Sequence, residues 1–369
     1  DIISMARPML ADPDLIRKTL EGREDEINTC IACNQACLDH IFSGKICSCL
    51  VNPRACHETE LNYTPTDNPK SIAVVGAGPA GLAYADVAAR RGHKVSLYDS
   101  ASEIGGQFNL AKQIPGKEEF FETLRYFKRR IEVEGIVLHL DTRVSADSLK
   151  DKGFDEVIVA TGIAPRTPDL EGIDHHKVVS YIDAIKGVKP IGKKVAIMGA
   201  GGIGFDVAEL IMHKGLSGSM DIDTFAREWG IDFENHPRGG VTDVEPVVES
   251  ADREVYLLQR KSTPVGRGLG KTTGWTHRIA LSRRGVKMIN GVEYLKIDDD
   301  GLHVMIDNEP QVLGVDTVIV CAGQSPLREL HDDLVKAGLN STLVGGAFEA
   351  AELDAKRAIK QACELAAVV

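Results

Sequence analysis

No stretch of this 369-residue chain approaches the roughly 18 consecutive apolar residues of a membrane-spanning helix. The chain also lacks an excess of basic residues, because 43 lysines and arginines stand against 54 aspartates and glutamates, for a net charge of −11. Nucleic acids and anionic membrane surfaces both require a basic face. The composition therefore argues against both of these partners and predicts a soluble protein.

The chain has no secretory leader and no initiating methionine, and it begins within the apolar run DIISMARPML. We therefore expect a fragment of a longer protein, with a short strand at residues 2–6 and a helix opened by Asp12 and Pro13. Six of its eight cysteines crowd between Cys30 and Cys56 instead of spreading as a disulfide framework. This clustering favours a reducing compartment, so we predict a cytoplasmic protein.

Apolar strands alternate with helices through most of the chain after residue 70. Continuous runs rich in valine and isoleucine indicate a parallel sheet covered on both faces, and they occur at 157–162, 194–204, 254–259 and 316–323. The unit at 194–261 repeats the plan of the unit at 71–99. The sequence thus predicts an α/β protein with two nested Rossmann-like dinucleotide-binding domains. A polar insertion at 214–252 interrupts the second domain and has no functional interpretation.

The first glycine motif, Gly76-x-Gly78-x-x-Gly81, lies between a strand and a helix. Its glycines suit a tight turn, a close approach to pyrophosphate, and close packing of the helix on the strand. The helix N-terminus supplies N–H groups for the pyrophosphate. Asp99 ends the following strand, where a carboxylate binds a ribose hydroxyl, and the stretch GGQF at 105–108 is typical of flavin domains. We predict an FAD site.

The second motif, Gly199-x-Gly201-Gly-x-Gly204, also follows an apolar strand and opens a helix. Its second strand ends in Gln259, Arg260 and Lys261 rather than in an acid. A carboxylate there would repel a 2′-phosphate, whereas the two cations would pair with it. We therefore predict NADPH as the nicotinamide cofactor.

The cysteine spacing Cys30-x2-Cys33-x3-Cys37-x11-Cys49 supplies four thiolates, which suits zinc or an iron–sulfur cluster. The spacing does not resemble paired zinc knuckles, and a thioredoxin-like dithiol would require a βαβ unit beside it. A cluster also complements the predicted flavin, since FAD accepts an electron pair and a cluster transfers electrons singly. Spacing alone leaves Cys47, Cys49 and Cys56 open as the fourth ligand.

Several longer stretches resemble the bacterial NADPH-dependent 2,4-dienoyl-CoA reductases, relatives of trimethylamine dehydrogenase and the clostridial enoate reductases. The resemblance covers essentially the whole chain, and it is carried by SMARP, CxxCNQxCLDxIFxGK, CLVNPRACHE, VVGAGPAGL, IGGQFNLAKQIPGKEEF, VAIMGAGGIGFD, LLQRK, GLGKTTGWTHR and AELDAKRAI. It implies a TIM barrel with FMN, a 4Fe–4S cluster and an FAD/NADPH module. The implied boundaries are 1–28 for the end of the barrel, 29–69 for the iron–sulfur segment and linker, 70–190 and 316–369 for the FAD-binding domain, and 191–315 for the NADPH-binding domain.

The resemblance also implies roles for individual residues. It places Arg7 near the FMN phosphate and selects Cys30, Cys33, Cys37 and Cys49 as cluster ligands. Phe348 departs from the family pattern, which has an aspartate contacting the flavin shortly after Gly345 and Gly346. The predicted cofactor-binding set further includes Pro79, Ala80, Gly105, Gly106, Gln107, Thr161, Gly162, Gly202, Gly323 and Gly346.

The function implied is transfer of electrons from NADPH through FAD and the cluster to FMN, for reduction of a dienoyl-CoA in the oxidation of unsaturated fatty acids. The substrate-reducing residues of the family lie in the barrel, most of which is outside this chain. Two alternatives stay open: an enoate reductase or amine dehydrogenase of the same group, and an electron-transfer subunit serving a protein partner.

Overall fold

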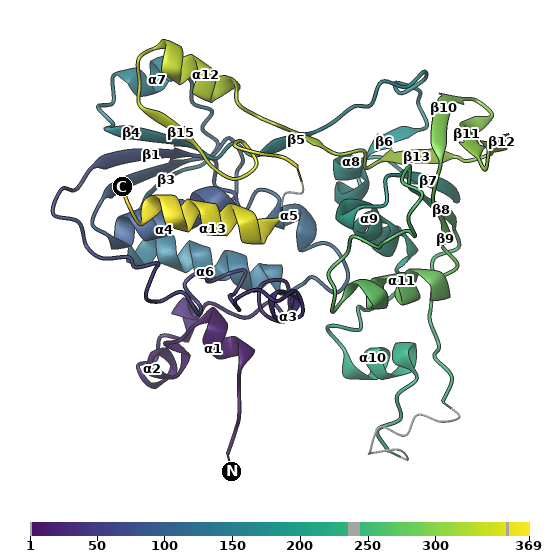
Figure 1. The fold of residues 1–369 in the computed structure, drawn as a ribbon, viewed down its shortest axis with the longest axis horizontal. Helices are drawn as coiled ribbons and strands as arrows, with labels where there is room; N and C mark the ends of the chain where they lie inside the picture. The colour runs from purple at the N-terminus through teal and green to yellow at the C-terminus, as the bar shows by residue number, and fades with distance from the viewer. Residues whose placement is uncertain (1, 235–243, 352–353) are drawn as a thin grey trace. The chain divides into compact units, whose positions relative to one another are not determined.

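The computed structural model describes residues 2–234, 244–351 and 354–369 (Figure 1). The chain divides into two compact units. Unit 1 comprises Asp1–Asn109, Glu119–Ala164 and Gln324–Val369, and unit 2 comprises Leu110–Glu118 and Pro165–Gly323. The sequence predicted changes of domain at 190/191 and 315/316, whereas the units change at 164/165 and 323/324. At the changes at 164/165 and 323/324, the chain forms the short strands β5 (Ile163–Pro165) and β14 (Gln324–Pro326), which pair in a two-stranded sheet.

Unit 1 is built on a five-stranded parallel sheet with the order β15-β4-β1-β2-β3. Its strands are β1 (Ser71–Val75), β2 (Lys94–Tyr98), β3 (Val137–His139), β4 (Glu156–Val159) and β15 (Ser341–Leu343). Alternate side chains of β1 point to opposite faces of the sheet. Ile72 and Val74 pack under the helices α4 (Pro79–Arg90), α6 (Phe120–Val133) and α13 (Ala355–Ala366). Ala73 and Val75 pack under α7 (Ala146–Lys150) and α12 (Glu329–Lys336), so both faces are covered as predicted.

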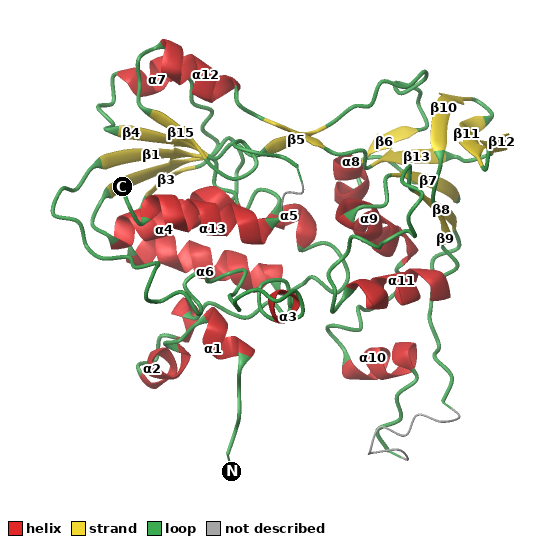
Figure 2. Cartoon of the chain, viewed as in Figure 1, coloured by secondary structure: helices red, strands yellow, loops and turns green. Residues whose placement is uncertain are grey.

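Unit 2 has a second five-stranded parallel sheet with the order β6-β13-β7-β8-β9. Its strands are β6 (Val178–Ser180), β7 (Lys194–Met198), β8 (Glu254–Leu258), β9 (Lys287–Ile289) and β13 (Thr317–Val320). One face packs against α8 (Tyr181–Lys186), α9 (Gly202–Met212) and α11 (Gly274–Arg283). The other face is covered by an antiparallel sheet of β10 (Glu293–Asp298), β11 (Gly301–Ile306) and β12 (Glu309–Leu313), a layer that the sequence did not predict (Figure 2).

The N-terminal segment differs from its prediction. Residues 2–6 form no strand, and Ile2 and Ile3 are 99% and 83% exposed. A strand needs a neighbour for its backbone hydrogen bonds, and none pairs with residues 2–6 in the described chain. Short helical elements follow instead, and the second begins two residues after Pro13: α1 (Arg7–Ala11), α2 (Leu15–Leu20) and η1 (Glu24–Glu26).

The remaining described elements are short. They are α3 (Leu38–Ile41), α5 (Phe108–Ala111) and α10 (Ile222–Trp229), the last lying in the 214–252 insertion. Residues 235–243 of that insertion, and two residues of the AELDAKRAI motif, lie outside the described residues. Among the described helices, none has the length and apolar character needed to cross a membrane.

Candidate functional site

The glycine turn between β1 and α4 accepts no larger residue at two of its three motif positions. Gly76 has a φ of +109°, and a Cβ added there would lie 2.3 Å from the carbonyl oxygen of Ala160. A Cβ on Gly81 would lie 1.8 Å from the carbonyl oxygen of Gly76. Gly78 is different, because it has an ordinary extended conformation and the nearest atom to an added Cβ is 3.9 Å away. Gly76 and Gly81 are therefore required by the fold, and Gly78 is available for a ligand to approach.

The N-terminus of α4 is open to an anion. Pro79 and Ala80 begin the helix after Gly78, and no described side chain caps its first N–H groups. Helix α9 is likewise uncapped after Gly201. Side chains cap α7, α8, α10 and α13 at Ser145, Ser180, Asp221 and Asp354, whereas α6, α11 and α12 are uncapped like α4 and α9. Free N–H groups and the positive end of the helix dipole suit a pyrophosphate, so both predicted dinucleotide turns have the required chemistry.

Asp99 and the GGQF stretch lie against the first glycine turn. The Asp99 carboxylate accepts hydrogen bonds from the backbone N–H groups of Ala77 (2.7 Å) and Ala101 (2.8 Å). Gly105 donates its N–H to the Ala77 carbonyl at 2.7 Å, and a Cβ on Gly106 would lie 3.0 Å from the Gly78 Cα. Asp99 thus orients the turn, and its carboxylate keeps lone pairs that are available to accept from a ribose hydroxyl, as predicted.

The other residues predicted for the flavin site fall into two groups, those that lie at the glycine turn and those that do not. The Thr161 backbone N–H lies beside Gly76, and the Thr161 hydroxyl donates to the Leu327 carbonyl at 2.7 Å. Gly345 approaches Ala80 at the start of α4. The structure thus brings Thr161, Gly162 and Gly345 to the glycine turn. Gln107 is exposed, and Gly323 falls in unit 2 beside Arg166.

Phe348, the departure from the family pattern, is 48% exposed two residues after the glycine pair. Its backbone carbonyl accepts a hydrogen bond from the Arg328 guanidinium, which also donates to the Ala347 carbonyl at 3.0 Å. Arg328 therefore holds this turn through backbone atoms. No sequence motif signals that role, because it depends on carbonyl positions that the residue types do not encode.

The turn between β7 and α9 in unit 2 repeats the construction of the first. Gly199 has a φ of +113°, and its added Cβ would lie 2.4 Å from the Cys321 carbonyl oxygen. A Cβ on Gly204 would lie 1.9 Å from the Gly199 carbonyl oxygen. Gly201 and Gly202 face open space, as the residues that approach a ligand should.

Arg260 and Lys261 extend from the end of β8 with exposed side chains. The backbone beneath them is anchored, because the Lys261 carbonyl accepts from Gly291 N–H and from Gln259 Nε2, each at 3.0 Å. Neither cation is paired with a carboxylate in the part of the chain that the structure describes. The site lacks the acid found at the end of β2 and has unpartnered positive charge, which suits a 2′-phosphate.

Four of the clustered cysteines surround one small pocket in unit 1. Cys30, Cys33, Cys37 and Cys49 line it together with Arg7, Leu10, Ile31, Asn34, Ala36 and Leu50. Cys47 and Cys56 are not among its lining residues. Arg7, which the resemblance assigned to an FMN phosphate, donates from Nη1 to the Asn34 side-chain oxygen at 2.8 Å. The fold therefore brings together the same four thiols that the resemblance selected.

Burial and nearby backbone N–H groups act on the pKa values of two of these thiols. Burial raises the pKa of Cys33 to about 11 and that of Cys49 to about 12, while the backbone N–H groups of Val51 and Asn52 act on Cys49 in the opposite direction. A buried thiol such as that of Cys33 or Cys49 is deprotonated when it coordinates a metal ion. N–H groups aimed at sulfur are also a means of tuning iron–sulfur clusters. The residues present fit a four-thiolate metal centre.

Two residues outside the cysteine motif position this segment, and the sequence did not single them out. Arg125 of α6 donates to the carbonyls of Asp25 and Ile27 and to the Thr29 hydroxyl. Asn28 donates its N–H to Asp12 Oδ2 at 2.8 Å and its side-chain amide to the Val51 carbonyl at 2.9 Å. These hydrogen bonds connect the segment before Cys30 to the segment after Cys49, and they connect the first of these segments to helix α6 of unit 1.

With this geometry established, residues 70–346 match the pyridine nucleotide-disulphide oxidoreductase family. The chain belongs to this family. The chain is therefore a flavin-dependent NAD(P)H oxidoreductase, and the family implies FAD and a nicotinamide dinucleotide as its cofactors.

Relatives of this oxidoreductase include a metal reductase of Desulforamulus reducens, 32% identical over 95% of this chain and 52% of the relative. A cinnamate reductase of Clostridium sporogenes is 33% identical over 58% of this chain and 32% of that protein. Among solved structures, a 2-naphthoyl-CoA reductase in complex with 2-naphthoyl-CoA superposes with a TM-score of 0.84 at 28% identity, covering 100% of this chain and 50% of the other. The chain thus spans about half the length of the relatives that it matches most fully.

Gly78 and Gly81, in the turn predicted to bind FAD, should respond differently to replacement by alanine. Gly78→Ala is expected to fold normally, because its Cβ meets no close atom, yet to weaken FAD binding at least tenfold by obstructing the pyrophosphate. Gly81→Ala is expected to destabilise unit 1 by about 3 kcal/mol, because its Cβ collides with backbone. Thermal unfolding of flavin-free protein and FAD titration separate the two effects. Equal destabilisation by both variants would contradict the assignment of Gly78 to the ligand.

Proposed function

We propose that this chain carries electrons from NADPH, by way of FAD, to a 4Fe–4S cluster, and that it is part of a longer reductase of the 2,4-dienoyl-CoA reductase type. The observation that carries the proposal is the convergence of four thiols on one pocket in the same unit that holds the flavin turn. A flavin next to a thiolate cluster in one compact unit suits electron transfer rather than structural support.

Each cofactor has a set of residues suited to hold it. The open N-terminus of α4 would bind the FAD pyrophosphate, and Asp99 would accept from a ribose hydroxyl. The N-terminus of α9 would bind the NADPH pyrophosphate, with Arg260 and Lys261 at its 2′-phosphate. The four cysteines would ligate the cluster. When bound, NADPH supplies a hydride that FAD accepts as an electron pair, and a 4Fe–4S cluster passes electrons on singly.

In the longer protein, we place FMN in a barrel that precedes the cysteine segment, with Arg7 near its phosphate and a conjugated dienoyl-CoA as substrate. The likeness to a structure with bound 2-naphthoyl-CoA supports a CoA thioester. The likeness to a cinnamate reductase supports a second candidate, reduction of a free conjugated acid. Assay of the longer protein with dienoyl-CoA against cinnamate distinguishes the two.

Anaerobic titration of the purified chain tests the electron path. NADPH is expected to bleach the flavin and then to generate the EPR signal of a reduced cluster, and the chain alone should reduce artificial acceptors but not dienoyl-CoA. Iron analysis accompanies the spectra. Iron near zero with no EPR signal, in protein that retains a reducible flavin, would remove the cluster from the proposal.

A further inference from the structure

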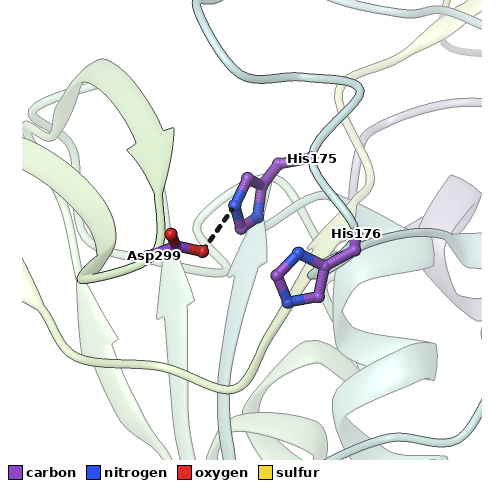
Figure 3. Close-up of side chains that lie close together, drawn as sticks. All are labelled: His175, His176 and Asp299. Carbon is purple, nitrogen blue, oxygen red and sulfur yellow. Dashed lines mark hydrogen bonds and ion pairs between the residues drawn. The ribbon is translucent and has the colours of Figure 1, made fainter.

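Two adjacent histidines and an aspartate meet on unit 2, away from both glycine turns along the chain. His175 and His176 lie in the loop before β6, and Asp299 lies in the turn between β10 and β11 (Figure 3). Their candidate ligand atoms all lie within 4.8 Å of one another. We propose that His175, His176 and Asp299 form a site for a divalent transition-metal ion of the zinc class, which joins this loop to the hairpin.

The spacing of these groups is close to that of a coordinated ion. Nε2 of His175 lies 3.2 Å from Oδ1 of Asp299. Ligands about 2.0–2.1 Å from a tetrahedral zinc stand roughly 3.3 Å apart, so this pair already matches one edge of the tetrahedron. His176 packs beside His175 with ring centroids 4.3 Å apart and ring planes tilted by 40°. Because His176 and Asp299 are exposed, their side chains are free to close the remaining distance around an ion.

The backbones that carry the ligands are joined independently of the ligands themselves. Ile297 donates its N–H to the Glu171 carbonyl at 2.9 Å, and Gly172, with a φ of +77°, packs against the Ile297 carbonyl so closely that an added Cβ would lie 1.9 Å away. Lys177 Nζ donates to the Asp299 carbonyl at 2.6 Å. The loop and the hairpin are thus held in register before any ion binds, which lowers the entropy cost of binding.

A neighbouring group of similar composition differs in one decisive respect. Asp298, Asp300 and His303 also lie within 4.8 Å of one another. However, the Asp298 carboxylate already accepts from His303 Nε2, Lys296 Nζ and the Asp300 N–H, at 2.8, 2.8 and 3.0 Å. Asp299 has a side chain that is 93% exposed, and in the part of the chain that the structure describes its carboxylate accepts only from His175. The Asp299 carboxylate therefore has lone pairs available to a metal ion, whereas those of Asp298 are already used in hydrogen bonds.

The donor set selects the class of ion. Two imidazole nitrogens and one carboxylate oxygen suit Zn²⁺, Co²⁺, Ni²⁺ or Cu²⁺, whereas Mg²⁺ and Ca²⁺ prefer oxygen ligands alone. Three protein ligands leave one position for water. The acidic residues next to the ligands in sequence, namely Glu171, Asp174, Asp298 and Asp300, outnumber the neighbouring lysines Lys177 and Lys296, and this excess favours a divalent cation.

Titration of the tag-free chain with Co²⁺ tests the site, because cobalt reports its ligands in its absorption spectrum. Any cobalt that the thiol pocket takes up is common to all variants, so differences between them isolate the histidine site. We expect His176→Ala and Asp299→Asn each to weaken one equivalent of nitrogen- and oxygen-ligated Co²⁺ at least tenfold. Asp300→Asn makes the same charge change one residue away and is expected to bind as the unmodified chain does. Zn²⁺ should raise the melting temperature of the unmodified chain and of Asp300→Asn more than that of His176→Ala.

Three results would overturn the proposal. The first is cobalt uptake with only sulfur-ligated spectra, and the second is equal affinity in the unmodified chain and His176→Ala. The third is an equal loss in Asp299→Asn and Asp300→Asn, which would reveal diffuse attraction to an acidic surface. Within the described residues the His176 side chain makes no hydrogen bond, so His176→Ala is expected to fold normally.

Discussion

Cys49→Ser is expected to remove the iron and the EPR signal of the reduced cluster, leaving less than about a tenth of the iron of the unmodified chain. Cys49 lines the thiol pocket, and two backbone N–H groups, from Val51 and Asn52, point at its sulfur. A serine oxygen at this position is a poor ligand for iron in a sulfur-rich site. Iron analysis and EPR of the dithionite-reduced protein measure the outcome, and FAD content should stay unchanged because Cys49 is not part of the flavin turn.

Cys47→Ser and Cys56→Ser are the matched controls. Both cysteines come from the same stretch, yet neither lines the thiol pocket, and burial and the neighbouring Cys56 thiol raise the pKa of Cys47 to about 11. Each control should retain the full iron content and EPR signal. Loss of iron in Cys47→Ser together with its retention in Cys49→Ser would reverse the ligand assignment.

Both glycine turns could be predicted from the sequence because the residue type there is dictated by local sterics. At Gly81 and Gly204 any side chain would lie within 2 Å of a backbone carbonyl oxygen. The turn geometry therefore requires glycine at these positions, and the motif spacing in the sequence reveals the turn. The strands at 157–162, 194–204 and 254–259 were predicted for a similar reason. β4 and most of β7 are buried on both faces, whereas Glu254 and Tyr256 of β8 are half-buried, and each strand has a nearly continuous apolar run.

Features that depend on contacts between residues far apart in the sequence could not be predicted in this way. The strand expected at residues 2–6 is wrong because strand propensity cannot supply a partner. The β10–β12 layer was missed because its strands are half exposed and rich in charge, as the run from Glu293 to Asp298 illustrates. The grouping of His175 and His176 with Asp299 joins residues more than 120 positions apart, and no local pattern encodes it. Spacing alone also left the fourth cysteine ligand undecided.

Replacing both Arg260 and Lys261 with alanine is expected to raise the KM for NADPH about a hundredfold while changing the KM for NADH less than about threefold. The two cations follow β8 on an anchored backbone, and no carboxylate in the described chain neutralises them. A charge-assisted hydrogen bond to phosphate contributes about 1.5 kcal/mol or more, which is roughly tenfold for each residue. Stopped-flow reduction of the flavin at varied NADPH and NADH concentrations measures the change.

The control removes the same amount of positive charge from the opposite end of the sheet. Lys189 and Lys193 precede β7, whereas Arg260 and Lys261 follow β8, and both lysines are exposed. Since exposed charges more than about 10 Å apart are screened at physiological ionic strength, the Lys189→Ala, Lys193→Ala variant should bind NADPH within about twofold of the unmodified chain. A similar loss in both double variants would indicate long-range attraction instead of a 2′-phosphate contact. Faster flavin reduction by NADH than by NADPH in the unmodified chain would exclude this role for Arg260 and Lys261.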